Sequence, residues 1–467
     1  MRPKSKYFKK DLPLYMANEK VIANISRATR IAADKRRNSI ECIKNWEEMR
    51  EAGHRIRKSV IDNIRSNLDE FEKNAVRNGI IVKRAKNALE ANEIAVEIAN
   101  EHQAKRIVKS KSMITEEIGY NDYMIKRDYE VVETDLGEYI LQLAGESPSH
   151  LIGPAMHKSR VDIAELFNKK LKIPYSEDPQ FLTRAARNIL REKFLSADLG
   201  VTGANFGIVE NGSIVIVENE GNARMCFTLP KVHIAFIGME RLIPKVNDLG
   251  LFMTLLSQSA NGQKLTSYIS LMKGPRSASS YDGAEKRYYI IVDNGRSSFL
   301  DDDYLKQALY CIRCSACYNV CPVYQNIGGH AYGWVYQGPI GAVITPQFLG
   351  LENAVALPFA SSLCGSCTDV CPVKIPLHHL LLYQRNRIVK SGNTSSLEKS
   401  SMKAFTSIGK SDKKFNRVIK LGRVMQNLIP FGAFVRGWSR SRELPRIANT
   451  TFHEWWDSVA KNGKSPN

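Results

Sequence analysis

The sequence predicts an α/β domain followed by a smaller helical domain rich in cysteine, with a basic extension at each end of the chain. Three observations lead to this prediction. Strand-like apolar runs alternate with helical patterns over roughly residues 71–295. Seven of the nine cysteines lie between residues 311 and 371, and lysine and arginine are concentrated towards the two ends. We therefore expect four parts, residues 1–70, 71–295, 296–395 and 396–467.

The first seventy residues are predicted to be helical. Val21 and Ile25 recur at helical spacing, as do Val60 and Ile64 further along. We interpret these residues as the inner faces of helices that pack against the body of the protein.

The α/β domain is predicted from short apolar runs separated by helical patterns. The expected strands cover residues 80–82, 106–109, 129–133, 232–237 and 288–292. A hairpin is expected between 206–209 and 214–217, because Asn211-Gly212 is a strong turn signal. Asp178-Pro179 should begin a helix, with the carboxylate as its cap. Its inner face is predicted to be Phe181, Ala185, Ile189 and Phe194.

The cysteine-rich domain contains the run Cys311-Ile-Arg-Cys314-Ser-Ala-Cys317-Tyr-Asn-Val-Cys321-Pro322. This spacing is that of bacterial ferredoxins, in which three thiolates hold one iron–sulfur cluster and the fourth reaches a second cluster. Zinc also uses Cys-x2-Cys pairs, but a single tetrahedral site has no use for a third closely spaced cysteine. The run therefore indicates iron–sulfur clusters and electron transfer.

A second, shorter run, Cys364-Gly-Ser-Cys367-Thr-Asp-Val-Cys371-Pro372, repeats the pattern with one ligand missing. Crosswise ligation predicts a first cluster on Cys311, Cys314, Cys317 and Cys371, and a second on Cys321, Cys364 and Cys367. Ser361 occupies the position of the missing cysteine. The fourth iron of the second cluster could be bound by the serine oxygen, by water or by a ligand from a partner. Alternatively that iron is absent, which leaves a three-iron cluster. Two roles are possible for such a cluster: electron transfer despite the lost ligand, or chemistry at an iron with an open position. We prefer electron transfer.

Charge and composition restrict the partners and the compartment. Residues 372–467 carry 18 Lys and Arg against 5 Asp and Glu, and residues 1–70 carry 17 against 10, so the centre of the chain is close to neutral. No nucleic-acid motif accompanies this charge, so we expect no nucleic acid as a partner. With no disulfide framework, no apolar segment behind the N-terminal charges and no run of eighteen apolar residues, we expect a cytoplasmic protein without a membrane span.

Several polar clusters in the α/β domain are candidates for a small-molecule site. Lys109-Ser-Lys-Ser112 follows a predicted strand, where open α/β sheets bind ligands. His150 and His157 are weak candidates for acid–base groups, with a structural role preferred for each. Glu218, Asn222 and Arg224 follow the hairpin and suit a carboxylate ligand. No glycine-rich nucleotide motif follows a strand, which argues against a bound dinucleotide.

Two further segments flank or follow the clusters. Residues 327–341 are dense in glycine and aromatics, suited to backbone contacts with cluster sulfur and to excluding water; His330 is expected to form hydrogen bonds there. Residues 391–415 are predicted to be a linker. An amphipathic basic helix should follow over 417–428, with Trp438, Phe452, Trp455 and Trp456 beyond it. We expect this tail to bind a partner subunit, with peripheral membrane contact as the second interpretation.

Together these pieces resemble the lactate utilisation protein B family, the iron–sulfur subunit of a bacterial L-lactate oxidation system. The resemblance spans nearly the whole chain. It includes both cysteine runs, Val108-Lys-Ser-Lys-Ser-Met113, Pro148-Ser-His-Leu-Ile-Gly-Pro154 and Ile327-Gly-Gly-His-Ala-Tyr-Gly333.

The resemblance implies an α/β lactate-utilisation domain, similar to sugar isomerases and coenzyme-A transferases, and an α-helical ferredoxin domain. It also implies two [4Fe-4S] clusters on seven cysteines, and two companion proteins with which the family converts L-lactate to pyruvate for growth. We expect an electron-transfer subunit of that complex. The alternatives are a catalytic subunit that binds the hydroxy acid, with His150 or His157 removing a proton, and an iron–sulfur redox sensor.

Overall fold

The computed structural model describes residues 3–428 and 445–461 of the chain. The chain divides into two compact units, Met1–Ser391 and Gly392–Asn467. The first unit contains every strand found in the described residues, and all nine cysteines.

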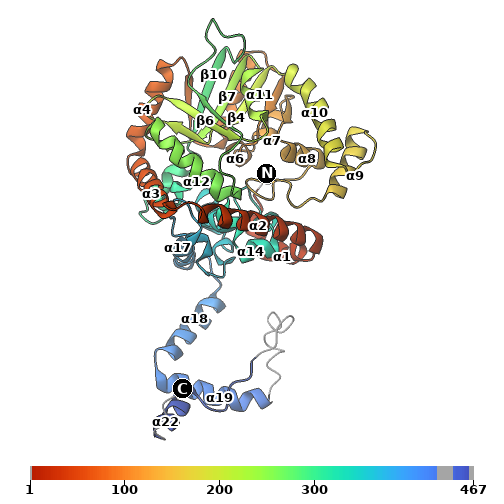
Figure 1. Ribbon diagram of the computed structural model, residues 1–467. Helices are drawn as coiled ribbons and strands as arrows, with labels where there is room; N and C mark the ends of the chain where they lie inside the picture. The colour runs from red at the N-terminus through yellow and green to blue at the C-terminus, as the bar shows by residue number, and fades with distance from the viewer. Residues whose placement is uncertain (1–2, 429–444, 462–467) are drawn as a thin grey trace. The chain divides into compact units, whose positions relative to one another are not determined.

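A six-stranded parallel sheet forms the centre of the α/β domain (Figure 1). Its strand order is β1-β10-β7-β4-β2-β3, and all neighbouring strands are parallel. The strands are β1 (Ile81–Ala85), β2 (Arg106–Lys109), β3 (Glu130–Glu133), β4 (Leu199–Gly203), β7 (Val232–Gly238) and β10 (Lys286–Val292). The five strands predicted for this sheet are confirmed, and β4 is an addition to them.

Helices cover both faces of this sheet. On β2, Ile107 belongs to one hydrophobic core and Val108 to another, because successive strand residues point to opposite faces. The first core includes α5 (Ala88–Glu101), α6 (Met113–Glu117) and α7 (Tyr120–Ile125). The second includes α8 (Leu136–Ala144), α9 (Arg160–Leu171), α10 (Pro179–Leu195) and α11 (Asn222–Thr228). Burial on both faces explains why these strands are continuous apolar runs in the sequence.

Helix α10 begins as predicted but buries a different face. The Asp178 side chain accepts hydrogen bonds from two backbone N–H groups of the first turn, and Pro179 is the first helical residue. Phe181 is 37% exposed and Ala185 is only half-buried, so the predicted inner face is wrong at these two positions, whereas half-buried Ile189 packs against the core. The buried residues are Leu182, Ala186, Leu190 and Phe194. Two apolar stripes lie side by side on this helix, and packing on the sheet selects the second.

A second sheet of four strands, in the order β8-β5-β6-β9, packs into a separate core region. Its strands are β5 (Phe206–Ile208), β6 (Ser213–Glu218), β8 (Leu242–Ile243) and β9 (Tyr268–Met272). The predicted hairpin is confirmed as the antiparallel pair β5–β6. At its turn Gly212 has φ +66°, and a Cβ there would lie 2.1 Å from the backbone nitrogen of Ala75. Both the backbone conformation and the close approach therefore require glycine.

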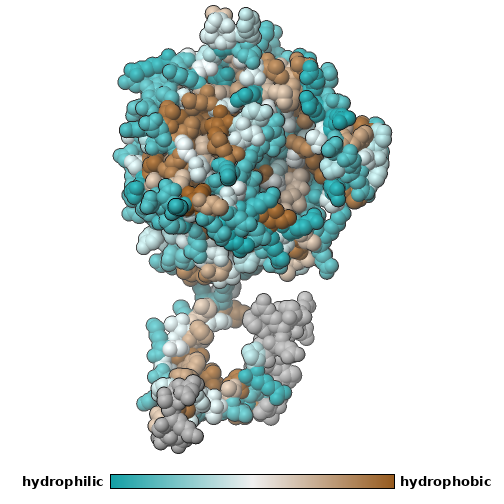
Figure 2. All heavy atoms as spheres, in the orientation of Figure 1, coloured by the Kyte–Doolittle hydropathy of each residue, from teal (hydrophilic) through white to brown (hydrophobic). Residues whose placement is uncertain are grey.

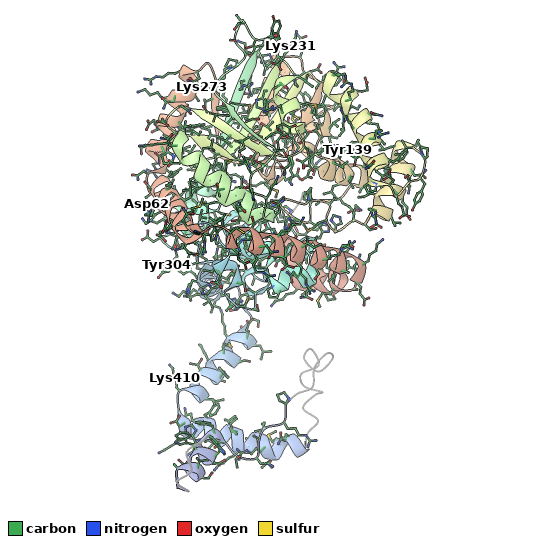
Figure 3. The ribbon with its side chains drawn as sticks, in the orientation of Figure 1. Asp62, Tyr139, Lys231, Lys273, Tyr304 and Lys410 are labelled. Carbon is green, nitrogen blue, oxygen red and sulfur yellow. The ribbon has the colours of Figure 1, made fainter. Side chains whose placement is uncertain are left out.

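The N-terminal helices pack against the rest of the first unit, as predicted. They are α1 (Phe8–Met16), α2 (Glu19–Glu41), α3 (Trp46–Asp62) and α4 (Ile64–Arg77), preceded by the 3-10 turn η1 (Ser5–Tyr7). Helix α2 contacts α12 (Leu249–Asn261) on one side and the cysteine-rich helices α13 (Ala316–Asn319) and α14 (Pro322–Ile327) on the other (Figure 1). Asp62 pairs with Lys306, Oδ1 to Nζ 3.4 Å, and Figure 3 shows Asp62 and Tyr304 on the same side of the unit.

The cysteine-rich segment is helical and shares one hydrophobic core with the second sheet and the N-terminal helices. Its remaining helices are α15 (Gly338–Leu349), α16 (Ser366–Asp369) and α17 (Leu377–Lys390). Short 3-10 turns connect the elements: η2 (Val246–Asp248), η3 (Arg296–Phe299), η4 (Leu305–Tyr310), η5 (His330–Tyr332), η6 (Leu351–Asn353) and η7 (Leu357–Phe359). The α/β and cysteine-rich segments are therefore parts of one packed body.

The second unit contains α18 (Ser396–Gly409), α19 (Asp412–Leu428) and α22 (Phe452–Lys461). The predicted amphipathic helix is confirmed as α19, but the predicted linker is wrong where α18 forms. The Ser395 side chain caps α18 by accepting a hydrogen bond from the Glu398 N–H, 3.1 Å, and no residue of this helix is buried. Figure 2 shows hydrophobic side chains on the surface of this unit.

Trp438 lies outside the described residues. In the ranges that the structure describes, no helix combines the length and apolar character needed to cross a bilayer.

Candidate metal centre and adjoining cavity

The first cysteine run winds through tight turns that bring three of its four cysteines, Cys311, Cys314 and Cys317, to one small pocket. Cys311 follows η4, and Arg313 and Ser315 both have left-handed backbone conformations, φ +61° and +64°. Cys317 lies in α13, and Cys321 caps α14, whose first residue is the proline of the motif. Single left-handed residues reverse the chain sharply, which a regular helix cannot do.

The second run repeats these turns, with Ser361 at the position of Cys311. Leu363 and Gly365 are left-handed, φ +56° and +85°, like the corresponding residues of the first run. The Leu363 N–H donates to Ser361 Oγ at 3.1 Å, just as the Arg313 N–H donates to Cys311 Sγ at 3.4 Å. The two runs are therefore a structural repeat in which a hydroxyl replaces one thiol.

The seven cysteines fall into two neighbouring groups. One small pocket is lined by Cys311, Cys314, Cys317 and Cys371. The other group consists of Cys321, Cys364 and Cys367, whose thiols are near enough to one another to interact electrostatically. Cys317 also interacts with Cys367, so the groups adjoin. These groups equal the two sets expected from crosswise ligation, and the ligand assignment itself stays a prediction.

The surroundings of these cysteines suit iron–sulfur clusters. Burial raises the pKa of the Cys314 thiol to about 12 and that of Cys371 to about 11, so the thiolates need a strong positive charge, which bound iron supplies. Backbone N–H groups point at the sulfurs, with Ile375 N–H donating to Cys371 Sγ at 3.3 Å. Within the described residues, no three Cys, His, Asp or Glu side chains converge closely enough for one ion.

Buried arginines from the N-terminal helices bind the turn that carries Cys371. Arg50 of α3 donates to the Cys371 carbonyl oxygen through Nε and Nη2, at 3.1 and 2.9 Å. Arg36 of α2 donates through Nη2 to the Val370 carbonyl at 3.0 Å. Hydrogen bonds from a charged donor contribute about 1.5–3 kcal/mol each, so these helices help to hold the turn in place.

Two more arginines bind the turn that carries Cys311. Arg57 of α3 donates to the Leu309 carbonyl at 2.8 Å and the Tyr310 carbonyl at 3.2 Å. Arg241, which follows β7, donates through Nη1 to the Cys311 carbonyl at 2.8 Å. Four guanidinium groups therefore surround the first group of cysteines, where they offset the negative charge of thiolate ligands.

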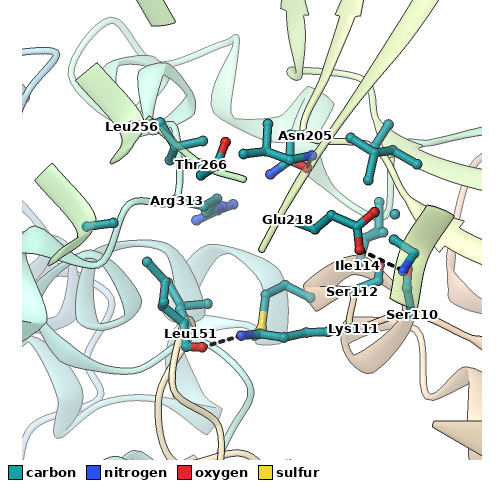
Figure 4. Close-up of a pocket in the computed structure, with 18 of the residues that line it drawn as sticks. Ser110, Lys111, Ser112, Ile114, Leu151, Asn205, Glu218, Leu256, Thr266 and Arg313 are labelled. Carbon is teal, nitrogen blue, oxygen red and sulfur yellow. Dashed lines mark hydrogen bonds between the residues drawn. The ribbon is translucent and has the colours of Figure 1, made fainter. Parts of the chain in front are cut away.

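A cavity of about 280 Å³ lies at the carboxyl ends of the parallel strands (Figure 4). Residues following β2, β4 and β7 line it, together with Glu218 of β6, Leu256 of α12 and Thr266. Arg313 of the first cysteine run also lines it. The cavity therefore joins the usual ligand position of an open α/β sheet to the loop that carries the cysteines.

Charged groups crowd the inner end of this cavity. Arg296 donates through Nε to Glu240 at 2.6 Å and binds Glu117 through both terminal nitrogens, at 2.7 and 2.8 Å. Burial disfavours the ionised form of Glu240, but the guanidinium groups of Arg296 and Arg313 outweigh it and lower the pKa of this carboxyl to about 2. Arg313 Nη2 lies 3.6 Å from Glu240.

The structure places most of the predicted polar cluster in this cavity. Ser110, Lys111, Ser112, Glu218 and Asn222 line it. Lys109 is instead fully buried beside it, paired with Glu133 at 2.8 Å. Arg224 points away from it, with its guanidinium 5.0 Å from the Tyr268 ring centre and bonded to Ser270.

The candidate histidines have structural surroundings. His150 Nδ1 accepts from the N–H groups of Ile152 and Gly153, both at 3.2 Å, and its Nε2 bonds Asn319 at 3.1 Å. Both ring nitrogens are thus occupied, and burial lowers the pKa of His150 to about 3.

Buried His157 and half-buried His330 form a second group. His157 Nδ1 bonds Ser149 Oγ at 2.7 Å and its Nε2 bonds Glu146 at 2.9 Å. His330 Nε2 donates to the Ser147 carbonyl at 2.8 Å, since a carbonyl oxygen only accepts. Its ring centre is 4.6 Å from that of His157. Neither histidine lines the cavity at the strand ends.

The arginines and Glu240 were missed by sequence reasoning. Glu240 and Arg241 directly follow a predicted strand, so the rule that selected Lys109–Ser112 would also have found them. Arg313 lies between two predicted ligands, and nothing in its local sequence indicates a binding role for its charge. Arg50 and Arg57 had no local signal, since only the tertiary structure brings them to the cysteine turns.

Three family descriptions match successive parts of the chain. Residues 68–292 match the LUD domain, 307–375 the 4Fe-4S dicluster domain, and 384–461 the C-terminal region of lactate utilisation protein B. Fold and site thus define an iron–sulfur protein with two [4Fe-4S] clusters beside an α/β domain.

Full-length relatives identify the family. The chain is 45% identical to lactate utilization protein B of Geobacillus kaustophilus over 437 residues, 91% of each chain. It is 45% identical to that of Shouchella clausii and 44% to that of Bacillus thuringiensis, over 90% of each chain. The chain belongs to the lactate utilization protein B family, and its role is in lactate utilization. A DUF162 family structure from Deinococcus radiodurans matches with a TM-score of 0.28 and 14% identity, covering 49% of this chain and 98% of that one.

The buried state of His157 predicts a pH dependence of stability. Burial lowers the pKa of His157 to about 4, below the ordinary value of 6.5, so the unfolded chain takes up its proton first as the pH falls. Stability from this group is complete above about pH 6.5 and is lost towards pH 4, up to about 3 kcal/mol. We expect Tm to fall between pH 7 and pH 5 by less in His157→Gln than in the wild type. An equal fall in both proteins would contradict this account.

Arg50 is predicted to raise the reduction potential of the first cluster. Arg50→Gln removes a buried positive charge beside Cys371, so the potential should fall by on the order of tens of millivolts, measured by redox titration with EPR detection. Arg55→Gln, an exposed position on the same helix, is the matched control and should change it little, because solvent screens its charge. Equal shifts in the two variants would show that burial of Arg50 is irrelevant.

Proposed function

We propose that this chain is the electron-transfer subunit of a cytoplasmic complex that oxidises L-lactate to pyruvate together with two companion proteins. The observation that carries this proposal is the pair of adjoining cysteine groups in one buried core. Family membership supplies the link to lactate. Growth on L-lactate is the physiological role that this activity supports.

The proposed ligands follow the two cysteine groups. Cys311, Cys314, Cys317 and Cys371 hold the first [4Fe-4S] cluster, and Cys321, Cys364 and Cys367 hold the second. We propose Ser361 as the group at the fourth position of the second cluster, because its backbone turn and its hydrogen bond repeat those of Cys311. Bound there, the clusters supply one-electron redox chemistry.

The chain contributes enclosure and charge balance to this chemistry. Tyr318, Tyr332 and Tyr336 are all at most 1% exposed and keep water from the interior of the cysteine-rich segment. The four arginines around the first group keep its ligand turns in place and favour the more negative, reduced state. Oxidation of a hydroxy acid releases two electrons, so two adjoining one-electron carriers suit a relay between the lactate donor and an acceptor.

We propose that the second unit docks on a companion subunit. Its helices leave large apolar side chains exposed between basic residues, with Phe405, Leu421, Val424 and Trp456 each at least 49% exposed. Apolar side chains rimmed by charge are typical of protein-binding surfaces. An anionic membrane surface is the competing partner for this unit.

The proposed function predicts that L-lactate reduces the clusters in the assembled complex. The anaerobically purified complex is examined by EPR before and after adding L-lactate, with dithionite reduction as the measure of full cluster content. We expect lactate to produce the signals of reduced clusters. The matched control is D-lactate at the same concentration, which should reduce them more slowly. Clusters that respond to dithionite and stay silent with L-lactate would overturn the proposal.

The repeat in the cysteine turns predicts that Ser361→Cys completes a four-thiolate set. A thiolate binds iron more firmly than a hydroxyl, so ferricyanide should convert the second cluster to a three-iron form several times more slowly than in the wild type. The conversion is followed by EPR, with iron and sulfide quantified in parallel. Ser279→Cys places a thiol at an exposed position between β9 and β10, outside the cysteine-rich segment, and should behave as the wild type. The same conversion rate in both variants would remove Ser361 from the fourth position.

A further inference from the structure

We propose that the cavity at the strand ends binds a small 2-hydroxy or 2-oxo carboxylate, with the ligand carboxylate on Arg313. This inference rests on the proposed function and deepens it, because it places the substrate class on this subunit rather than on a companion. It is carried by a buried guanidinium nitrogen with no hydrogen-bond partner among the described residues, by the size and lining of the cavity, and by its wall shared with the cysteines.

The charges at the inner end leave one guanidinium without a closely hydrogen-bonded carboxylate. Three arginines, Arg241, Arg296 and Arg313, face two carboxylates, Glu117 and Glu240. Arg296 binds both carboxylates closely, and Arg241 is occupied by backbone carbonyls. Arg313 has only the 3.6 Å approach to Glu240, and its buried Nη1 has no hydrogen-bond partner among the described residues. A buried N–H of this kind is normally satisfied, so an anionic ligand is the missing partner.

Arg313 is also held in place for such a ligand. Its guanidinium carbon lies 4.4 Å from the ring centre of Tyr336, and the Tyr336 hydroxyl donates to Glu117 at 2.5 Å. The stacked ring restricts the guanidinium plane, which lowers the entropy lost when a carboxylate binds.

The size and lining of the cavity select a small ligand with one negative charge. Its volume of about 280 Å³ is near the lower end of ligand pockets, which begin at roughly 300 Å³. Ile114, Ile216 and Leu256 provide apolar walls for a short alkyl group, and Asn205 provides an amide for a hydroxyl or keto oxygen. Glu218 lines the cavity as well (Figure 4), and its carboxylate disfavours ligands with several negative charges, such as phosphates.

The cavity adjoins the pocket of the first cysteine group. Arg313 and Leu151 line both spaces, so a ligand on Arg313 is separated from that group by these two side chains. Such a ligand changes the charge beside the first cluster without binding to it. Its presence should therefore alter the EPR signal of that cluster.

The test measures ligand binding to the cluster-loaded chain alone. Calorimetry and the EPR signal of the dithionite-reduced protein are recorded with L-lactate, pyruvate, neutral lactamide and inorganic phosphate. We expect L-lactate or pyruvate to bind and shift the signal, and the tighter of the two to define the class as hydroxy or oxo acid. Lactamide and phosphate should bind about ten- to a hundredfold more weakly, because one lacks the charge and the other carries too much.

Variants connect binding to the cavity. Arg313→Gln should weaken lactate binding by about ten- to a hundredfold. Since Arg313 lies between two proposed ligands, Ala260→Leu on α12 provides a second variant, outside both cysteine runs, that fills the cavity and should abolish binding. Iron is quantified in both variants to show that the clusters are retained. Arg184→Gln, an exposed position on α10, is the charge-matched control and should bind as the wild type.

Distinct outcomes separate this inference from the proposed function. Lactamide or phosphate binding as tightly as lactate would overturn the inference, as would unchanged binding in Ala260→Leu. Reduction of the clusters by lactate in the complex, with no carboxylate binding to this chain alone, would overturn the inference and leave the proposed function intact. Carboxylate binding here without cluster reduction in the complex would support the site and overturn the proposed function.

Discussion

Hydrogen bonds from buried guanidinium groups to the carbonyls of the cysteine turns are the interactions on which the rest of the first unit depends. The turns are too short and too sharply reversed to satisfy their own carbonyls as a helix would. Arg50 and Arg57 reach them from α3, and Arg241 reaches them from the end of β7. Because these residues come from distant parts of the chain, the N-terminal helices, the α/β domain and the cysteine-rich segment must fold together.

The same arginines link structure to electron transfer. Each of them places a positive charge beside ligand turns whose thiolates are negative, and each is excluded from water, which would otherwise screen the charge. The arrangement stabilises the fold and favours the reduced form of the first cluster at once. A surface arginine with the same number of hydrogen bonds would stabilise the fold but would have little effect on the reduced form, because solvent would screen its charge.

Much of the architecture was predictable because it depends on short-range pattern. The strands were visible as apolar runs, since a sheet covered on both faces leaves no polar alternation. The hairpin was visible from Asn211-Gly212, because its turn requires a left-handed glycine. The inner face of α10 and the helix at 396–409 were not, since two apolar stripes compete on the first and serine-rich composition conceals the second.

The sequence by itself determined most of the strands and helices and the presence of cluster-binding cysteines, because cysteine spacings of two and three residues are typical of cluster ligation. Only the tertiary structure decided which groups meet across long separations. Arg313 lies between Cys311 and Cys314 in the chain, yet it matters because Glu240, Tyr336 and the strand ends converge on it while its Nη1 finds no partner among the described residues. The sequence reveals that a residue is charged. How completely that charge is paired depends on every element that packs around it.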